Sequence, residues 1–249
     1  MAAAAVRRRL TWERATVVTT ERETRRAVRI TLEVDGWAGH VAGQHVDVRL
    51  TASDGYTAQR SYSIASPPQG TAVQLVVDRL DDGEVSPYLT DELRPGDVLE
   101  VRGPVGGYFV WPGEIDRPVQ LVAGGSGVVP FLAMIGYHRE VASRVAVRLL
   151  YSARTLDDVI ARADLDAPPA GVDVTLTLTR GAPAGWTGPT GRVDAGMLER
   201  FVVPPDREPE VLVCGPTPFV EAVARRLVRL GHATARIRTE RFGTTGEAR

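Results

Sequence analysis

The sequence predicts two successive domains: an antiparallel β-barrel of the Greek-key type, then an α/β domain with a mainly parallel sheet. The first domain is indicated by short runs in which apolar residues occupy every second position, separated by regular turn signals, a pattern typical of an antiparallel sandwich or barrel. The α/β domain is indicated by continuous apolar runs that alternate with segments of helical spacing. Because the pattern changes after Trp111-Pro112-Gly113, we assign residues 1–115 to the barrel and residues 116–249 to the α/β domain.

The barrel is expected to contain several short strands, each with one buried face. Dipeptides such as Asp35-Gly36 and Pro67-Pro68 mark the turns between them. A short helix is predicted over residues 86–93, before the last of these strands. From the period-two alternation of apolar residues, we predict strands over residues 28–34, 46–50, 73–77 and 98–101.

The second domain is expected to alternate strands with helices. Residues 118–123 form a continuous apolar run, which is typical of a parallel strand covered on both faces. A glycine-rich loop and a helix that reaches about Val141 follow this strand. Apolar residues recur at helical spacing from Phe219 to Leu230, and Gly231 ends that helix. Further strands are predicted over residues 145–151, 172–178 and 211–214.

Composition excludes several classes of protein. The formal net charge of −1 gives no reason to expect binding to nucleic acid. The single cysteine, Cys214, excludes an internal disulfide and a four-cysteine iron–sulfur centre, and four histidines argue against a zinc site. No G-x-S-x-G segment occurs, which disfavours a serine hydrolase. No window approaches about 18 apolar residues and no signal-peptide core follows residues 1–10, so we expect a cytoplasmic protein without a membrane span.

The glycine-rich loop predicts an anion site. It joins a buried strand to a helix, so its amide groups and the helix dipole point to one place. The glycines at 124, 125 and 127 leave room for a pyrophosphate to approach the backbone, with Ser126 between them. Pro130 suits the first turn of a helix, where no amide donor is needed. The simpler alternative is a tight strand-to-helix turn with no ligand.

A second strand end suggests which dinucleotide is bound. An acidic residue at this position commonly holds the ribose hydroxyl, but here the residues are Tyr151-Ser152-Ala153-Arg154. The Ser152 hydroxyl and the Arg154 guanidinium favour a 2′-phosphate, and so favour NADPH over NADH. The alternative is a solvated loop with an incidental arginine. Arg180, after another strand, is a weaker candidate for a second phosphate ligand.

Two further segments have residue types suited to a redox site. In Arg60-Ser61-Tyr62-Ser63, alternation places the arginine and the tyrosine on one face. An arginine that binds phosphate and a tyrosine that covers an aromatic ring suit a flavin nucleotide, although an ordinary half-exposed strand would show the same pattern. Cys214-Gly215-Pro216 ends a strand and opens a helix. With no histidine nearby in sequence, the thiol is interpreted as a contact residue rather than a nucleophile.

Together these segments resemble the ferredoxin–NADP(+) reductase superfamily, and the resemblance covers nearly the whole chain. The family's R-x-Y-S motif matches residues 60–63, and its C-G-P segment matches residues 214–216. Its G-G-T-G-x-x-P loop matches residues 124–130, with serine in place of threonine. A second flavin motif, G-x-x-S, resembles Gly83-Glu84-Val85-Ser86, and Glu240-Arg241-Phe242-Gly243 resembles the family's terminal segment.

The resemblance implies two cofactors and a set of residues for each. FAD would be bound by Arg60, Ser61, Tyr62 and Ser63, by the pyrophosphate-binding segment with Gly83, Val85 and Ser86, and by Phe242 over the ring. NADPH or NADH would be bound by Gly124, Gly125, Ser126, Gly127, Pro130, Ser152, Arg154, Cys214, Gly215 and Pro216. Ser63, near the reactive flavin nitrogen, and Cys214, beside the nicotinamide, are the implied catalytic residues.

The resemblance also implies a reaction. Hydride would pass from NAD(P)H, with NADPH preferred, to FAD, and electrons would then leave to a separate redox protein such as a ferredoxin or to a small acceptor. Two alternatives from other classes are an obligate electron-transfer subunit of a larger complex and a non-catalytic, nucleotide-binding regulatory module.

Overall fold

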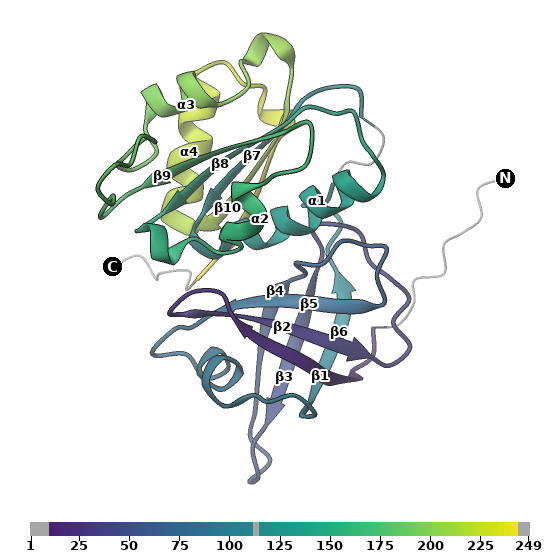
Figure 1. The fold of residues 1–249 in the computed structure, drawn as a ribbon. Coiled ribbons are helices and arrows are strands. Elements are labelled where there is room, and N and C mark those ends of the chain that lie inside the picture. The colour runs from purple at the N-terminus through teal and green to yellow at the C-terminus, as the bar shows by residue number, and fades with distance from the viewer. Residues whose placement is uncertain (1–9, 112–114, 244–249) are drawn as a thin grey trace, which may run out of the picture.

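The computed structural model describes residues 10–111 and 115–243 of the chain. In these residues a six-stranded antiparallel sheet is followed by a five-stranded parallel sheet with helices on both faces. Figure 1 shows the barrel formed by the first sheet below the α/β domain. The predicted fold class is therefore confirmed. None of the described residues form a helix long and apolar enough to cross a membrane.

The first sheet closes on itself to form a barrel. Its strand order is β4-β3-β6-β1-β2-β5, and an antiparallel bridge between Ile64 and Leu75 joins the end of β4 to β5. Inward-facing aliphatic residues fill the barrel, because every second residue of each strand points inside. The strands are β1 (Glu13–Arg22), β2 (Ala27–Val34), β3 (His45–Thr51), β4 (Thr57–Ser63), β5 (Ala72–Asp78) and β6 (Val98–Val105).

The predicted short helix is present, and it ends in a π-helical turn, η1 (Tyr88–Glu92). Strand β1 is a strand that the alternation of apolar residues did not predict. Only Ala15 and Val17 of this strand are buried, and its register with β2 shifts between Val17 and Thr19. A bulge of this kind breaks the period-two pattern.

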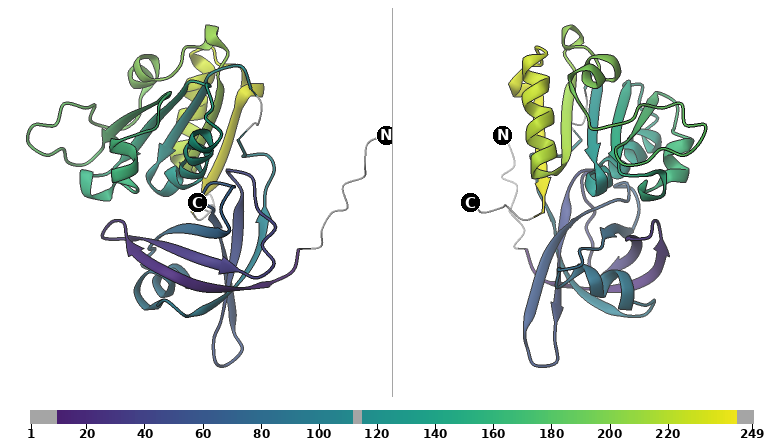
Figure 2. Two further views of the ribbon diagram at one scale, coloured as in Figure 1. Left: turned by 45° about the vertical axis from the view of Figure 1, so that its right-hand side comes forward. Right: turned by 90° about the vertical axis from the view of Figure 1, so that its left-hand side faces the viewer.

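The second sheet is parallel throughout, in the order β11-β10-β7-β8-β9. Alternate residues of one strand enter different cores: Leu121 of β7 packs with α1, whereas Val122 packs with α3 and α4. This explains the continuous apolar runs, and Figure 2 shows α4 apart from α1 across the sheet. The elements are β7 (Val119–Gly124), α1 (Val129–Glu140), β8 (Val147–Ala153), α2 (Arg162–Asp166), β9 (Val172–Leu178), α3 (Ala195–Phe201), β10 (Glu210–Pro216), α4 (Thr217–Arg229) and β11 (Ile237–Phe242).

Strand β11 brings the end of the chain back to the domain interface. It pairs in parallel with β10, and this register sets Glu240 opposite Cys214 and Phe242 opposite Pro216. The sequence pattern did not predict this strand, because its residues are mostly polar and, apart from the exposed Arg241, half-buried rather than alternating.

Polar contacts tie the barrel to the α/β domain at two sides of their interface. The amide of Ala161 donates a hydrogen bond of 2.9 Å to the Glu23 carboxylate, which also forms a 2.5 Å ion pair with Arg29. At the other side, Arg238 of β11 donates to the carbonyl of Val110 at 3.3 Å. The two domains therefore meet along a seam that continues into an open cleft.

Candidate active site between the two domains

A cleft of about 550 Å³ lies where the barrel faces the carboxyl ends of the parallel strands. Ligands of open α/β sheets bind at this end of the strands. The α/β domain contributes Gly124, Gly125, Ser126, Ser152, Arg154, Pro216 and Phe242 to its walls, all of which were predicted as site residues. The barrel contributes Thr24, Arg26 and Asp78, none of which was predicted.

The glycine loop is a rigid backbone cradle, and packing explains part of its composition. A Cβ atom at Gly127 would lie 2.3 Å from the carbonyl oxygen of Cys214, and one at Gly124 would lie 2.8 Å from the Phe219 ring. Gly125 instead faces open space and adopts a left-handed φ of +57°. Packing against β10 therefore requires a glycine at 127, while Gly125 and Ser126 line the cleft.

The loop after β8 is fixed in place beside the cradle. Ser152 is buried at the cleft wall, and Arg154 follows it into the cleft. Thr155 and Asp158 then form a reciprocal capping box that holds the next turn. Three further arginines from other elements line the same cleft, namely Arg180, Arg192 and Arg226. Such a concentration of guanidinium groups suits a ligand with several phosphate charges.

The two predicted flavin motifs of the barrel are joined by one carboxylate. Glu84 lies in the Gly83–Ser86 segment and forms a 3.0 Å ion pair with Arg60 of β4. The same carboxylate accepts a hydrogen bond of 2.7 Å from the Tyr56 hydroxyl. The Arg60 side chain remains 54% exposed, so its guanidinium is accessible to a phosphate.

The remaining motif residues of β4 face different surroundings. The Ser61 hydroxyl donates to Asp47 at 2.6 Å, which engages it with the neighbouring strand. Tyr62 packs against the barrel core, and burial raises the pKa of its phenol. The structure thus brings Arg60, rather than Ser61, together with the second flavin motif.

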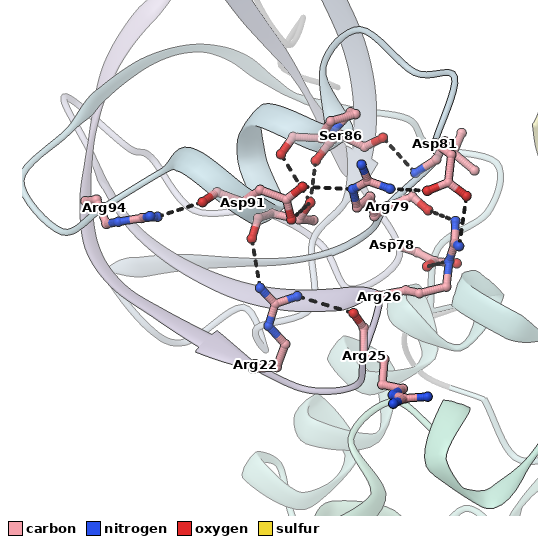
Figure 3. A network of polar contacts seen from close by, with 12 residues as sticks. Arg22, Arg25, Arg26, Asp78, Arg79, Asp81, Ser86, Asp91 and Arg94 are labelled. Atoms are coloured by element: carbon pink, nitrogen blue, oxygen red, sulfur yellow. Dashed lines mark hydrogen bonds and ion pairs between the residues drawn. The ribbon is translucent and has the colours of Figure 1, made fainter.

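The Gly83–Ser86 segment is a closed turn that leads into the helical residues before η1. The Ser86 hydroxyl accepts a 3.0 Å hydrogen bond from the Leu80 amide, and Val85 is fully buried. A Cβ atom at Gly83 would lie 2.9 Å from the Ser86 hydroxyl oxygen. Figure 3 shows Ser86 next to the ion pairs of Arg79 with Asp81 and Asp91, which brace this turn.

A carboxylate that we had not predicted as a site residue lies between the two predicted catalytic residues. The Ser63 hydroxyl donates to Glu240 at 3.5 Å across the domain interface, and Glu240 is opposite Cys214 in the β10–β11 register. Burial raises the pKa of Glu240 to about 7, against a smaller opposing effect of the Ser63 hydrogen bond. The only signal in the sequence was its place in the terminal segment, two residues before Phe242.

The Cys214 thiol is neutral at physiological pH. It is 1% exposed, and burial raises its pKa well above the usual range, with the nearby Glu240 charge acting in the same direction. Reactive cysteines have lowered pKa values and access to solvent. The arrangement therefore argues against a thiolate nucleophile.

Comparisons with known proteins support this interpretation of both halves. The family model of the oxidoreductase FAD-binding domain matches residues 15–110, and that of the oxidoreductase NAD-binding domain matches residues 121–225. The glycine betaine monooxygenase reductase subunit of Chromohalobacter salexigens is 34% identical over 209 residues, which cover 82% of this chain and 56% of that protein. NADH-cytochrome b5 reductase 1 of Pyricularia oryzae is 31% identical over 205 residues, which cover 78% of this chain and 65% of that protein.

Solved structures agree with this match. A cytochrome P450 reductase from Amycolatopsis superposes with a TM-score of 0.82 at 26% identity, covering 94% of this chain and 70% of that chain. A ferredoxin NADP+ reductase from Neisseria gonorrhoeae with bound FAD and NADP gives a TM-score of 0.80 at 19% identity, covering 92% and 98% of the two chains. At that identity the second likeness shows the fold alone. The chain therefore carries an FAD-binding domain followed by an NAD-binding domain, and it belongs to the ferredoxin–NADP(+) reductase superfamily.

Proposed function

We propose that this protein is an FAD-dependent oxidoreductase that takes electrons from NADPH in preference to NADH and passes them to a separate acceptor. The observation that carries this proposal is the placement of β11. Phe242 lies in the arginine-rich cleft, and Glu240, two residues earlier, contacts Ser63 of the barrel's flavin motif. The nucleotide cleft and the flavin motif are therefore adjacent, as electron transfer between two bound coenzymes requires.

Residues of the barrel fit the flavin nucleotide. Arg60 is held beside the Gly83–Ser86 turn by Glu84, which supports one ligand for both motifs. In our assignment the guanidinium binds phosphate, and Tyr62 and Phe242 cover the ring system. When bound, FAD supplies a group that accepts two electrons and releases them singly or as a pair.

Residues at the interface position the reacting groups and control protons. The Ser63 hydroxyl and the neutral Cys214 thiol are small contacts that orient rings without adding charge. Glu240, with a pKa near 7, can hold or release a proton at neutral pH beside Ser63.

The preference for NADPH rests on the loop after β8. Ser152 and Arg154 lie at the edge of the cleft where the adenosine ribose of a dinucleotide is expected. Arg180 and Arg192 line the same cleft, so a 2′-phosphate would enter a region of positive charge. Relatives named for NADH also belong to this superfamily, which makes this part of the proposal the one to test first.

Replacement of one arginine tests the coenzyme preference. Arg154→Ala should raise the KM for NADPH by about 10–100-fold, as expected for the loss of one charge-assisted contact, and should change the KM for NADH little. Arg144→Ala, which removes an exposed arginine after α1, is the matched control and should alter neither value. An equal loss for both coenzymes would refute the assignment of the 2′-phosphate to Arg154.

We propose a separate electron acceptor for the reduced protein. These 249 residues contain one cysteine, too few for a four-cysteine iron–sulfur centre among them, so electrons have to leave this part of the polypeptide. Its relatives include proteins named as a monooxygenase reductase subunit and as an NADH-cytochrome b5 reductase, and we assign an acceptor protein of the oxygenase or cytochrome class. Reduction of a dye by the isolated chain and NADPH would support an autonomous reductase. A chain that reduces the dye only within a complex would support an obligate subunit instead.

A further inference from the structure

The barrel places an ion pair in the wall of the nucleotide cleft. Arg26, just before β2, and Asp78, at the end of β5, both line the cleft. They come from adjacent strands, since Ala27 pairs with Asp78 in the β2–β5 register. Figure 3 shows the Arg26 guanidinium directed toward Asp78 and Asp81. No sequence motif pointed to either residue.

Arg26 is held in one orientation by several partners. Its guanidinium forms a 3.1 Å ion pair with Asp81 and a 3.8 Å ion pair with Asp78, and it donates to the carbonyl of Arg79. Asp81 is itself paired with Arg79, whose other partner is Asp91 at 2.8 Å. A side chain ordered in this way loses little entropy when it binds a ligand. At 38% exposure the guanidinium still reaches solvent in the cleft.

Asp78 is an unexpected residue for a phosphate site. Five arginines line this cleft, whereas its carboxylates are Asp78 and Asp158. Burial raises the pKa of Asp78, while the charges of Arg26 and Arg154 oppose that rise and those of Asp158 and Asp81 add to it. The Asp78 carboxylate thus offsets part of the positive charge of Arg26 and Arg154, and it competes with a phosphate for that charge.

We propose that Arg26 is a coenzyme-phosphate ligand supplied by the flavin domain, and that Asp78 is the counter-ion that this phosphate displaces. The inference rests on the proposed function, because the phosphate is that of the nicotinamide coenzyme. The nicotinamide coenzyme is then bound by residues of both domains. Arg26 and Asp78 have opposite effects on its affinity. Arg26 strengthens binding, and Asp78 weakens it.

Calorimetric titration of the FAD-loaded protein with NADP+ tests whether Arg26 strengthens binding and Asp78 weakens it. Arg26→Ala should raise the Kd by about 10–100-fold, the effect of one charge-assisted contact. Arg25→Ala is the matched control, because this neighbouring arginine is exposed and does not belong to the cleft wall as described. It should leave the Kd within about twofold. Arg26→Lys keeps the positive charge but loses the bidentate guanidinium, so its affinity should lie between those of the unmodified protein and Arg26→Ala.

Asp78→Asn should change the Kd for NADP+ in the opposite direction to Arg26→Ala. It removes the competing charge, while Asp81 and the Arg79 carbonyl still hold Arg26. The Kd for NADP+ should fall about three- to fivefold, as expected for a partly screened pair. Titrations with 2′,5′-ADP and with 5′-ADP then show which phosphate is involved. A larger effect of Arg26→Ala on the first assigns it to the 2′-phosphate, and a larger effect on the second assigns it to the pyrophosphate.

Two results would overturn the inference. One is an Arg26→Ala protein with the affinity of Arg25→Ala. The other is weaker binding by Asp78→Asn, which would make Asp78 an acceptor for a ribose hydroxyl. Failure of the proposed function looks different, because the unmodified protein would then bind none of these nucleotides.

Discussion

Strands β4 and β7 carry the two coenzyme motifs, and they are built in opposite ways. Every residue of β7 is buried, between β8 and β10, and its loop offers backbone amides. Residues of β4 are exposed or half-buried, and side chains of its predicted motif contact Glu84, Asp47 and Glu240. Substitutions in the nucleotide loop should therefore disturb the fold, whereas those in the flavin motif should disturb binding alone.

The largest effect is expected at Gly127. A methyl group there would lie 2.3 Å from the carbonyl oxygen and 2.5 Å from the carbonyl carbon of Cys214, so β10 or the loop has to move. Gly127→Ala should lower the free energy of unfolding by about 3 kcal/mol or more, at the upper end of overpacking effects. Urea unfolding of the FAD-free protein measures it.

Gly125→Ala is the control for this change. It also alters the loop, but it meets open space and costs only the left-handed conformation, about 1 kcal/mol. Equal destabilisation by both variants would show that packing against β10 does not dictate the glycine at 127.

At Arg60 we expect a large effect on binding and almost none on folding. Its ion pair with Glu84 is exposed, so Arg60→Ala should change the free energy of unfolding of the FAD-free protein by less than about 0.5 kcal/mol. The Kd for FAD should rise by about 10–100-fold, as measured by quenching of flavin fluorescence. Arg14→Ala, an exposed arginine of β1, should change neither value. A Kd for FAD unaltered by Arg60→Ala would remove the motif's arginine from the flavin site.

A smaller, pH-dependent effect is expected at Glu240, where the two regions meet. Its pKa rises from 4.5 to about 7 on folding, so the unfolded chain releases this proton first as the pH increases. Ionisation of Glu240 therefore lowers the free energy of unfolding as the pH rises from about 4.5 to about 7, by at most about 3 kcal/mol. Glu240→Gln should flatten this decline in the FAD-free protein. Stability curves that run parallel from pH 5 to pH 8 would contradict the burial of an ionisable Glu240.

The same contrast explains what the sequence could predict. The β7–loop–α1 unit was predictable because its strand, glycines and proline are consecutive, and local packing dictates them. Strand β1 was missed because a bulge near Val17 breaks its alternation. Glu240, Arg26 and Asp78 were missed because each acquires its role from a partner distant in sequence, as in the contact of Glu240 with Ser63.

The central claim is that both coenzymes bind to this one chain and exchange electrons there. Its most direct test is to load the purified protein with FAD and titrate it with NADPH without oxygen, following the flavin absorbance. We predict about one FAD per chain and complete bleaching by about one equivalent of NADPH, since the coenzyme delivers two electrons. A chain that takes up no FAD, or one whose bound flavin neither NADPH nor NADH can bleach, would contradict the account.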